Sequence, residues 1–281
     1  MKIISSISAL KTILRQEGAS GKSIGFVPTM GALHAGHINL VERSKKENDL
    51  TVTSIFVNPT QFNNPEDLKK YPKTLEHDCE LLTPAGCDYV FAPSAEEMYA
   101  NLPNLSFHFG NLETVMEGAF RPGHFNGVGI VVSKLFHIVQ PTRAYFGLKD
   151  LQQVAVIRRL VHDLSFDLEI IPCETVRELD GLAMSSRNMR LMPEERGFAP
   201  QIYKTLQMAK YALLQGSSAK EAKDLAVDYL KKYPAFNLEY IEISDFDALQ
   251  PLDTQNKKGK TAICIAAFIG SVRLIDNVIF D

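Results

Sequence analysis

The segment SIGFVPTMGALHAGH, residues 23–37, runs from a short apolar stretch into a turn rich in glycine and histidine. Residues 23–28 have the length and composition of a buried strand, and residues 37–46 have the pattern of a helix. The turn between them therefore lies where a strand ends and a helix begins, which is where parallel α/β sheets bind ligands.

The alternation of strand and helix continues through the first two-thirds of the chain. Further strands are expected at residues 50–57, 87–92, 144–146 and 168–172, and helices at residues 127–139 and 150–164. Strands that alternate with helices require right-handed crossovers and form a parallel sheet. The sequence therefore predicts an α/β fold in which residues 1–176 form a Rossmann-like parallel sheet domain.

The pattern changes after residue 176. Helical stretches at residues 193–214 and 219–233 precede β-rich runs at residues 238–244, 261–268 and 272–279, with a tight hairpin at residues 269–271 and a polar surface loop at residues 253–260. Residues 177–281 are expected to form a smaller α+β domain, whose size is a common one.

The composition is that of an ordinary globular protein. Of 281 residues, 45% are hydrophobic and 22% are charged, and the formal net charge is −3. Proteins that bind long nucleic acids normally carry a basic surplus that neutralises phosphates, so this balance argues against a nucleic-acid partner. The four cysteines form no CxxC pair, and the sequence lacks a signal peptide and any apolar stretch long enough to span a bilayer. We expect a cytoplasmic protein without a membrane partner.

Two histidines in the first turn, His34 and His37, are the strongest candidates for chemistry. They lie three residues apart at a helix start and share one face, while Gly36 lets a ligand approach the backbone. Free N–H groups and the helix dipole add to the imidazoles, so the turn suits a phosphate, which would favour protonated rings. Metal binding is the weaker alternative because the glutamate of HExxH is missing and no third ligand lies nearby in the sequence.

Further polar segments lie at the ends of expected elements. MSSR at residues 184–187 sets two hydroxyls beside a guanidinium, which suits a polyphosphate, although a helix cap is an equal alternative. GLKD at residues 147–150 sets a lysine beside an aspartate, which suits phosphate and Mg²⁺, although the aspartate can instead cap a helix. Gln61 and Gln153 are neutral amides able to bind hydroxyls and a carboxylate, although a glutamine that only fills a loop is an equal alternative. The lone GxG at residues 127–129 indicates helix packing rather than a dinucleotide site.

Six motifs occur in order along the chain: PTMGALHAGH at residues 28–37, FVNPTQF at 56–62, YPKT at 71–74, RPGHF at 121–125, GLKDLQQ at 147–153 and MSSRN at 184–188. Together they resemble the pantothenate synthetase family over essentially the whole chain. The HxGH element also resembles the HIGH signature of nucleotidylyltransferases and class I aminoacyl-tRNA synthetases. Lys73, Leu148 and Leu151 depart from residues common in the family, and none of them removes a group that the chemistry needs.

The resemblance implies an ATP-dependent ligase that joins pantoate to β-alanine through a pantoyl-adenylate, with Mg²⁺, in a homodimer whose C-terminal domain acts partly as a lid. The residues implied to contact ATP are Met30, His34, Gly36, His37, Gly147, Lys149, Asp150, Val176, Met184, Ser185, Ser186 and Arg187, and Asp150 also touches Mg²⁺. The implied residues for pantoate or β-alanine are Gln61, Gln153, Asn58 and Arg121, and the implied catalytic residues are His37, His34 and Lys149. Tyr71, Asp78 and Glu117 match positions that line or support the cavity.

Two other functions compete with this interpretation. An adenylyltransferase that attaches AMP to a phosphorylated acceptor shares the HxGH element, but it needs neither an amine site nor the FVNPTQF and MSSRN pair. A non-catalytic RNA-binding relative of the tRNA synthetases is disfavoured by the acidic net charge.

Overall fold

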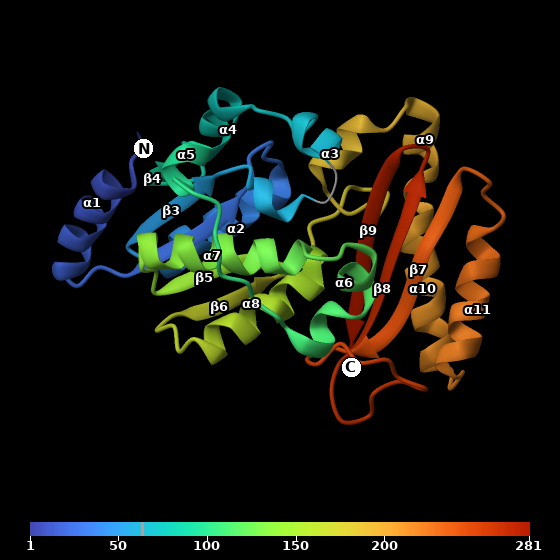
Figure 1. Ribbon diagram of the computed structural model, residues 1–281. Coiled ribbons are helices and arrows are strands. Elements are labelled where there is room, and N and C mark those ends of the chain that lie inside the picture. The colour runs from blue at the N-terminus through green and yellow to red at the C-terminus, as the bar shows by residue number, and fades with distance from the viewer. Residues whose placement is uncertain (63–64) are drawn as a thin grey trace.

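The computed structural model describes residues 1–62 and 65–281 (Figure 1). The strands are β1 Lys2–Ile4, β2 Ile24–Thr29, β3 Leu50–Ile55, β4 Tyr89–Phe91, β5 Arg143–Gly147, β6 Glu169–Cys173, β7 Phe236–Asp245, β8 Thr261–Ile269 and β9 Val272–Phe280. The α-helices are α1 Ile7–Ala19, α2 Ala35–Glu47, α3 Pro65–Lys69, α4 Leu75–Leu82, α5 Ala95–Met98, α6 Met116–Phe120, α7 His124–Val139, α8 Leu151–Asp163, α9 Pro193–Phe198, α10 Gln201–Leu214 and α11 Ala219–Leu230. Short 3-10 helices are η1 Pro59–Gln61, η2 Gly110–Glu113, η3 Leu148–Asp150 and η4 Ser186–Arg190.

The larger sheet has six strands in the order β1-β4-β3-β2-β5-β6, and its paired strands are all parallel. Successive side chains of β2 enter different cores: Phe26 packs with residues of α1, α7 and α8, and Val27 packs with residues of α2 and α4. This alternation explains the apolar run of β2, because a strand covered by helices on both faces has no solvent-facing side.

The strand order reverses direction at β2. The chain proceeds from β2 outward to β3 and β4, then returns to β5 on the other side of β2 and continues to β6. At such a switch point the loops leaving the two strands diverge, and a crevice opens at their carboxyl ends. The segments after β2 and β5 are the HxGH and GLKD turns, so the topology brings them together.

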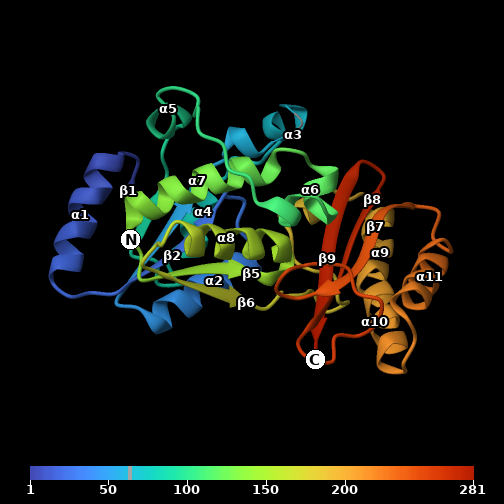
Figure 2. The ribbon, with the colours of Figure 1, turned by 60° about the horizontal axis from the view of Figure 1, so that its bottom comes forward.

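The second sheet is antiparallel in the order β7-β8-β9. Figures 1 and 2 show it standing between the larger sheet's helices and the pair α10 and α11. One face forms a core with α10 and α11, and the other packs against residues of α6 and α8. The α/β fold with a smaller α+β part is therefore confirmed. The domain boundary at residues 176 and 177 lies in the segment after β6 and stays a prediction.

Several element boundaries differ from those expected. The expected helix at residues 193–214 is two helices, α9 and α10, because Pro200 lacks an N–H and interrupts the hydrogen-bond ladder between them. β1 and α1 were not predicted, and α2 begins at Ala35, before the expected start. The hairpin between β8 and β9 is confirmed, with Gly270 at a φ of 54°. In the described part of the chain, no helix combines the length and apolarity needed to cross a membrane.

Candidate active site

A cavity of about 210 Å³ opens at the carboxyl ends of β2 and β5. The segments that meet in it follow β2, β3, β5 and β6 in the chain. From the sequence-predicted residues it is lined by Met30, His34, Gly36, His37, Gln61, Arg121, Gly147, Lys149, Asp150, Gln153, Val176, Met184, Ser185, Ser186 and Arg187. Asn58 is the one predicted site residue that does not line it.

The two histidines are fixed by the first turn of α2. His34 is the N-cap residue, and its Nδ1 accepts a hydrogen bond from the Gly36 N–H at 3.2 Å. Nδ1 of His37 accepts from the His34 N–H at 3.4 Å, and the ring centroids lie 4.1 Å apart. A Cβ on Gly36 would lie 2.9 Å from the His34 ring, so only glycine leaves the rings in place. Because both Nδ1 atoms accept, each neutral ring carries its proton on Nε2.

Burial keeps these imidazoles neutral. It is the largest cause that lowers the pKa of His34 to about 4, with the Lys149 cation adding to it, and burial followed by His34 and Lys149 lowers the pKa of His37 to about 3. Protonation would also remove the lone pairs that cap α2. The protonated state that a phosphate would favour must overcome these shifts, so the rings offer Nε2–H donors rather than full charges.

Lys149 and Asp150 lie in η3, between β5 and α8. The Lys149 side chain is 19% exposed, and its Nζ is 4.0 Å from the Asp150 carboxylate, which is 49% exposed. Asp150 precedes α8 but makes no capping hydrogen bond with its side chain, so the capping alternative does not account for it. Among the residues whose side chains the structure describes, no three His, Cys, Asp or Glu groups lie close enough together to hold a metal.

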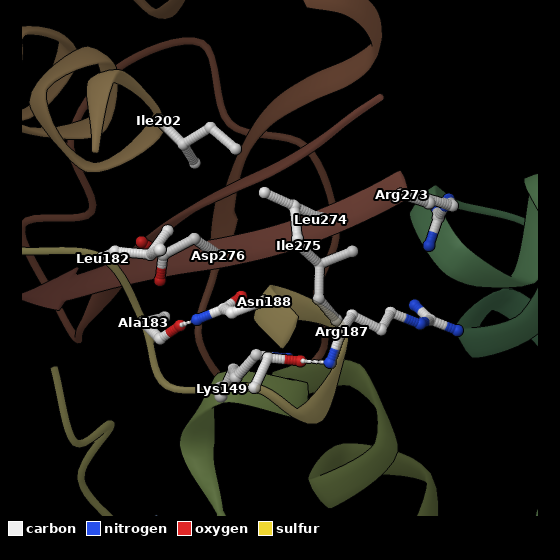
Figure 3. A pocket seen from close by; sticks show the side chains of 11 residues that line it. Lys149, Leu182, Ala183, Arg187, Asn188, Ile202, Arg273, Leu274, Ile275 and Asp276 are labelled. Carbon is white, nitrogen blue, oxygen red and sulfur yellow. Dashed lines mark hydrogen bonds between the residues drawn. The ribbon is translucent and has the colours of Figure 1, made fainter. Parts of the chain in front are cut away.

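The MSSR segment contains the helix cap considered for it. Ser185 is the N-cap of η4 and accepts a hydrogen bond from the Arg187 N–H at 3.3 Å. Asn188 ties this segment to the residue that precedes it by donating to the Ala183 carbonyl at 3.0 Å, as Figure 3 shows. The serines and Arg187 still line the cavity, so capping fixes the segment while its polar groups face the cavity.

Gln61 is held from behind. Nδ2 of Asn58 donates to the Gln61 Oε1 at 3.1 Å and to the Gly127 carbonyl at 3.2 Å. A Cβ on Gly127 would lie 2.3 Å from the Thr60 carbonyl oxygen, so this glycine lets α7 approach η1 closely. The interpretation of Gly127 as a helix-packing residue is confirmed. Asn58, 1% exposed, orients Gln61 rather than lining the cavity.

A family model described as pantoate-beta-alanine ligase matches residues 2–279. The chain belongs to this family. Pantothenate synthetases of Cytophaga hutchinsonii and Bacteroides fragilis are 50% and 52% identical to it, covering 98% and 99% of this chain and 98% of each relative. The crystal structure of pantothenate synthetase from Thermus thermophilus superposes with a TM-score of 0.93 at 44% identity, covering 99% of both chains. That of the pantoate-beta-alanine ligase from Francisella tularensis, complexed with beta-gamma ATP and β-alanine, gives 0.83 at 38% identity, covering 99% of this chain and 97% of the other.

Membership of the pantoate–β-alanine ligase family settles the class of reaction. The protein is an AMP-forming ligase that uses ATP to join pantoate and β-alanine into pantothenate through a pantoyl-adenylate. The competing adenylyltransferase is not favoured, because the match extends over nearly the whole chain and not just over the HxGH element.

Sequence reasoning missed His124 as a site residue of the ligase. Its Nδ1–H donates to the Gln61 carbonyl at 2.9 Å, and its Nε2 accepts from Arg121 at 3.2 Å. The Arg121 guanidinium also lies 3.4 Å from the Glu117 carboxylate. The sequence marked His124 only as part of the RPGHF motif and gave no sign of its role, because its hydrogen-bond partner is a backbone atom 63 residues away.

The buried histidine makes stability of the ligase depend on pH. His124 is 6% exposed, and burial, with the Arg121 charge, lowers its pKa to about 4. The unfolded chain binds a proton near pH 6.5, so stability is full above that value and falls as pH drops toward 4. The limiting loss is about 1.4 kcal/mol per pH unit for each such group, and His34 and His37 act in the same direction.

Urea unfolding at pH 7.5 and 5.5 measures this loss. His124→Asn keeps a donor at the position of Nδ1 but does not titrate, so we expect a smaller pH dependence in this variant than in the parent. Equal dependence in the two proteins would contradict the assignment of His124 as a buried neutral imidazole.

Proposed function

We propose that this one cavity carries out both half-reactions, with cationic and N–H groups on its phosphate wall and neutral amides at the attacking carboxylate. The observation that supports it most strongly is the joint lining of the cavity by the HxGH turn, the Lys149 turn, the MSSR segment and the two glutamines. A carboxylate cannot lose oxide to an amine, so the reaction first makes AMP the leaving group.

In the first half-reaction, a pantoate oxygen attacks the α-phosphorus and pyrophosphate leaves. We assign the stabilisation of the phosphates to Lys149, Arg187, the serine hydroxyls and the Nε2–H groups of His34 and His37. These groups are already fixed by caps and packing, so they need little reorganisation as charge develops. The β-alanine nitrogen then attacks the acyl carbon of the adenylate, and AMP leaves.

We assign pantoate to the space between Gln61 and Gln153. Their amides can donate hydrogen bonds without neutralising the carboxylate, whereas an arginine there would lower its nucleophilicity. Asn58 and His124 then serve to hold Gln61, one through its side chain and the other through its carbonyl. Arg121 lines the cavity beside His124 and is our candidate for the β-alanine carboxylate.

The Asp150 side chain fits the proposed Mg²⁺ requirement. Mg²⁺ is commonly held by one or two carboxylates together with substrate phosphates, and Asp150 offers a half-exposed carboxylate on the cavity wall. When bound, the ion would neutralise phosphate charge. By resemblance we also infer a cytoplasmic homodimer, for which light scattering should give twice the chain mass of 31.3 kDa.

The direct test is to incubate the protein with ATP, Mg²⁺ and pantoate, with and without β-alanine, and to identify the products by mass. We expect pyrophosphate and enzyme-bound pantoyl-adenylate without β-alanine, and AMP and pantothenate with it. AMP transfer to a phosphorylated acceptor, with no dependence on β-alanine, would overturn the proposal.

Gln61→Glu is expected to raise the KM for pantoate at least about tenfold, the cost of losing one hydrogen bond to a charged group. The new carboxylate has no donor and repels the substrate's carboxylate. Steady-state kinetics at saturating ATP measure the effect, with Gln215→Glu as the control for an added charge at an exposed helix end. An unchanged KM for pantoate would remove Gln61 from the pantoate site.

A further inference from the structure

We infer that Asp276 and Asn277, consecutive residues of β9, are positioning residues that clamp the two phosphate-binding segments of the active site to one strand through side chains on its opposite faces. Neither residue belongs to a motif noted in the sequence. Both are buried, with exposed fractions of 3% and 5%. The inference rests on the proposed roles of the Lys149 turn and the MSSR segment at ATP.

Asn277 holds the Lys149 turn. Its Nδ2 donates to the carbonyl oxygens of Leu148 and Lys149, at 2.7 and 2.9 Å. Both N–H groups of a single amide are thus spent on two successive carbonyls of η3. Such a paired contact fixes both the position and the orientation of the turn, and so the direction in which the Lys149 side chain leaves it.

Asp276 holds the other segment through Arg177. Its carboxylate accepts from both terminal nitrogens of Arg177, at 2.7 and 2.9 Å. Arg177 also donates to the carbonyls of Gly181 and Asn277, and its guanidinium carbon lies 3.8 Å from the centroid of the Tyr203 ring. Because both groups are planar and are joined by two hydrogen bonds, the pair fixes the orientation of the Arg177 guanidinium as well as its position.

The hairpin that Arg177 anchors leads directly into MSSR. Arg177 pairs with Ala183 in an antiparallel bridge, and the Met184 N–H donates to the Val176 carbonyl at 3.0 Å. Fixing Arg177 therefore fixes the backbone from which Ser185 and Arg187 extend into the cavity.

The two anchors point in opposite directions because side chains alternate along a strand. Asp276 faces Arg177, which stacks on Tyr203 of α10, and Asn277 faces η3. Lys149, Ala183, Arg187 and Asp276 line one cavity of about 10 Å³, room for a single water, so the two segments lie close together beside β9 with almost no free space between them (Figure 3). The spacing between the Lys149 and Arg187 side chains is thereby set by one rigid element.

Asn277→Ala tests the clamp. We expect kcat/KM for ATP in single-turnover adenylation to fall about tenfold to a hundredfold, the scale of a displacement near 1 Å, while the KM for pantoate stays within about twofold. Val278→Ala is the matched control, because Val278 lies next on the same strand and packs in the core beside α10 and α11. It should lower the melting temperature without changing kinetics for ATP.

A double-mutant cycle separates a clamp from two independent supports. Asp276→Asn, or Arg177→Lys if that variant fails to fold, releases the second segment. Once either segment is free, the spacing between the two is lost. The double variant should therefore have a kcat/KM for ATP little lower than that of the more impaired single variant. The clamp would be overturned if the fold-losses in kcat/KM for ATP of the two single variants multiplied in the double variant, or if Asn277→Ala had a normal kcat/KM for ATP. If Lys149→Ala and Arg187→Ala also left ATP kinetics unchanged, the proposed site itself would be wrong.

Discussion

Lys149→Ala is expected to lower the rate of pantoyl-adenylate formation at least about a hundredfold, the loss typical of removing one preorganised electrostatic stabiliser. The Lys149 side chain is 19% exposed, and its turn is held by Asn277. Its charge therefore acts in a partly desolvated cavity, where Coulomb interactions are stronger than in water. It also acts from a fixed position.

Rapid-quench single turnover with ATP, Mg²⁺ and pantoate measures this rate directly. Lys220→Ala, at a lysine 84% exposed on α11, controls for loss of a positive charge. His37→Ala should show a loss of similar size, because it removes an Nε2–H donor and the cap on the His34 N–H. His37→Gln keeps an amide donor and should recover part of the rate. Near-normal adenylation in both alanine variants would exclude Lys149 and His37 from the phosphate site.

The parts of the fold that the sequence predicted are those with local causes. β2 is apolar throughout because both of its faces are buried, and the apolar residues of α8 recur at helical spacing because one of its faces is buried. Both patterns can be recognised in the sequence. β1 has only three residues, too few for a periodic signal. The break between α9 and α10 was missed although Pro200 marks it, because the apolar pattern continues across it.

The residues of the candidate site likewise fall into those that local sequence patterns predicted and those that they did not. Residues in short motifs at strand ends, such as His34 and Lys149, were found because the topology of a parallel sheet brings such ends together. Asn277 and His124 were not found, because their partners lie 128 and 63 residues away and neither spacing nor composition signals the pairing. Motifs thus identify groups that line the cavity, and tertiary contacts identify the groups that hold them in place.

Glu117→Ala is expected to cost about 3–5 kcal/mol of unfolding free energy, the usual loss when one partner of a buried ion pair is removed. The Glu117 carboxylate accepts from both terminal nitrogens of Arg273, at 2.9 and 2.7 Å, and from the Tyr240 hydroxyl at 2.9 Å. These contacts join α6 to the antiparallel sheet. Without Glu117, the 12% exposed Arg273 side chain keeps only Glu239 as its partner in the ion pairs described.

Urea unfolding at pH 7 measures this cost, with Glu80→Ala, at a glutamate 76% exposed, as the control. Tyr240→Phe removes one hydrogen bond and should cost only about 1 kcal/mol.

Burial alone would raise the pKa of Glu117, but Arg273, Arg121 and Tyr240 outweigh it and lower that pKa to about 2. The contribution of Glu117 to the free energy of unfolding is therefore complete above pH 4.5 and is lost as pH falls through 2. In Glu117→Gln, the free energy of unfolding should depend less on pH over this range. A Glu117→Ala variant as stable as the control would mean that the Glu117–Arg273 ion pair adds no net stability to the junction between α6 and the antiparallel sheet.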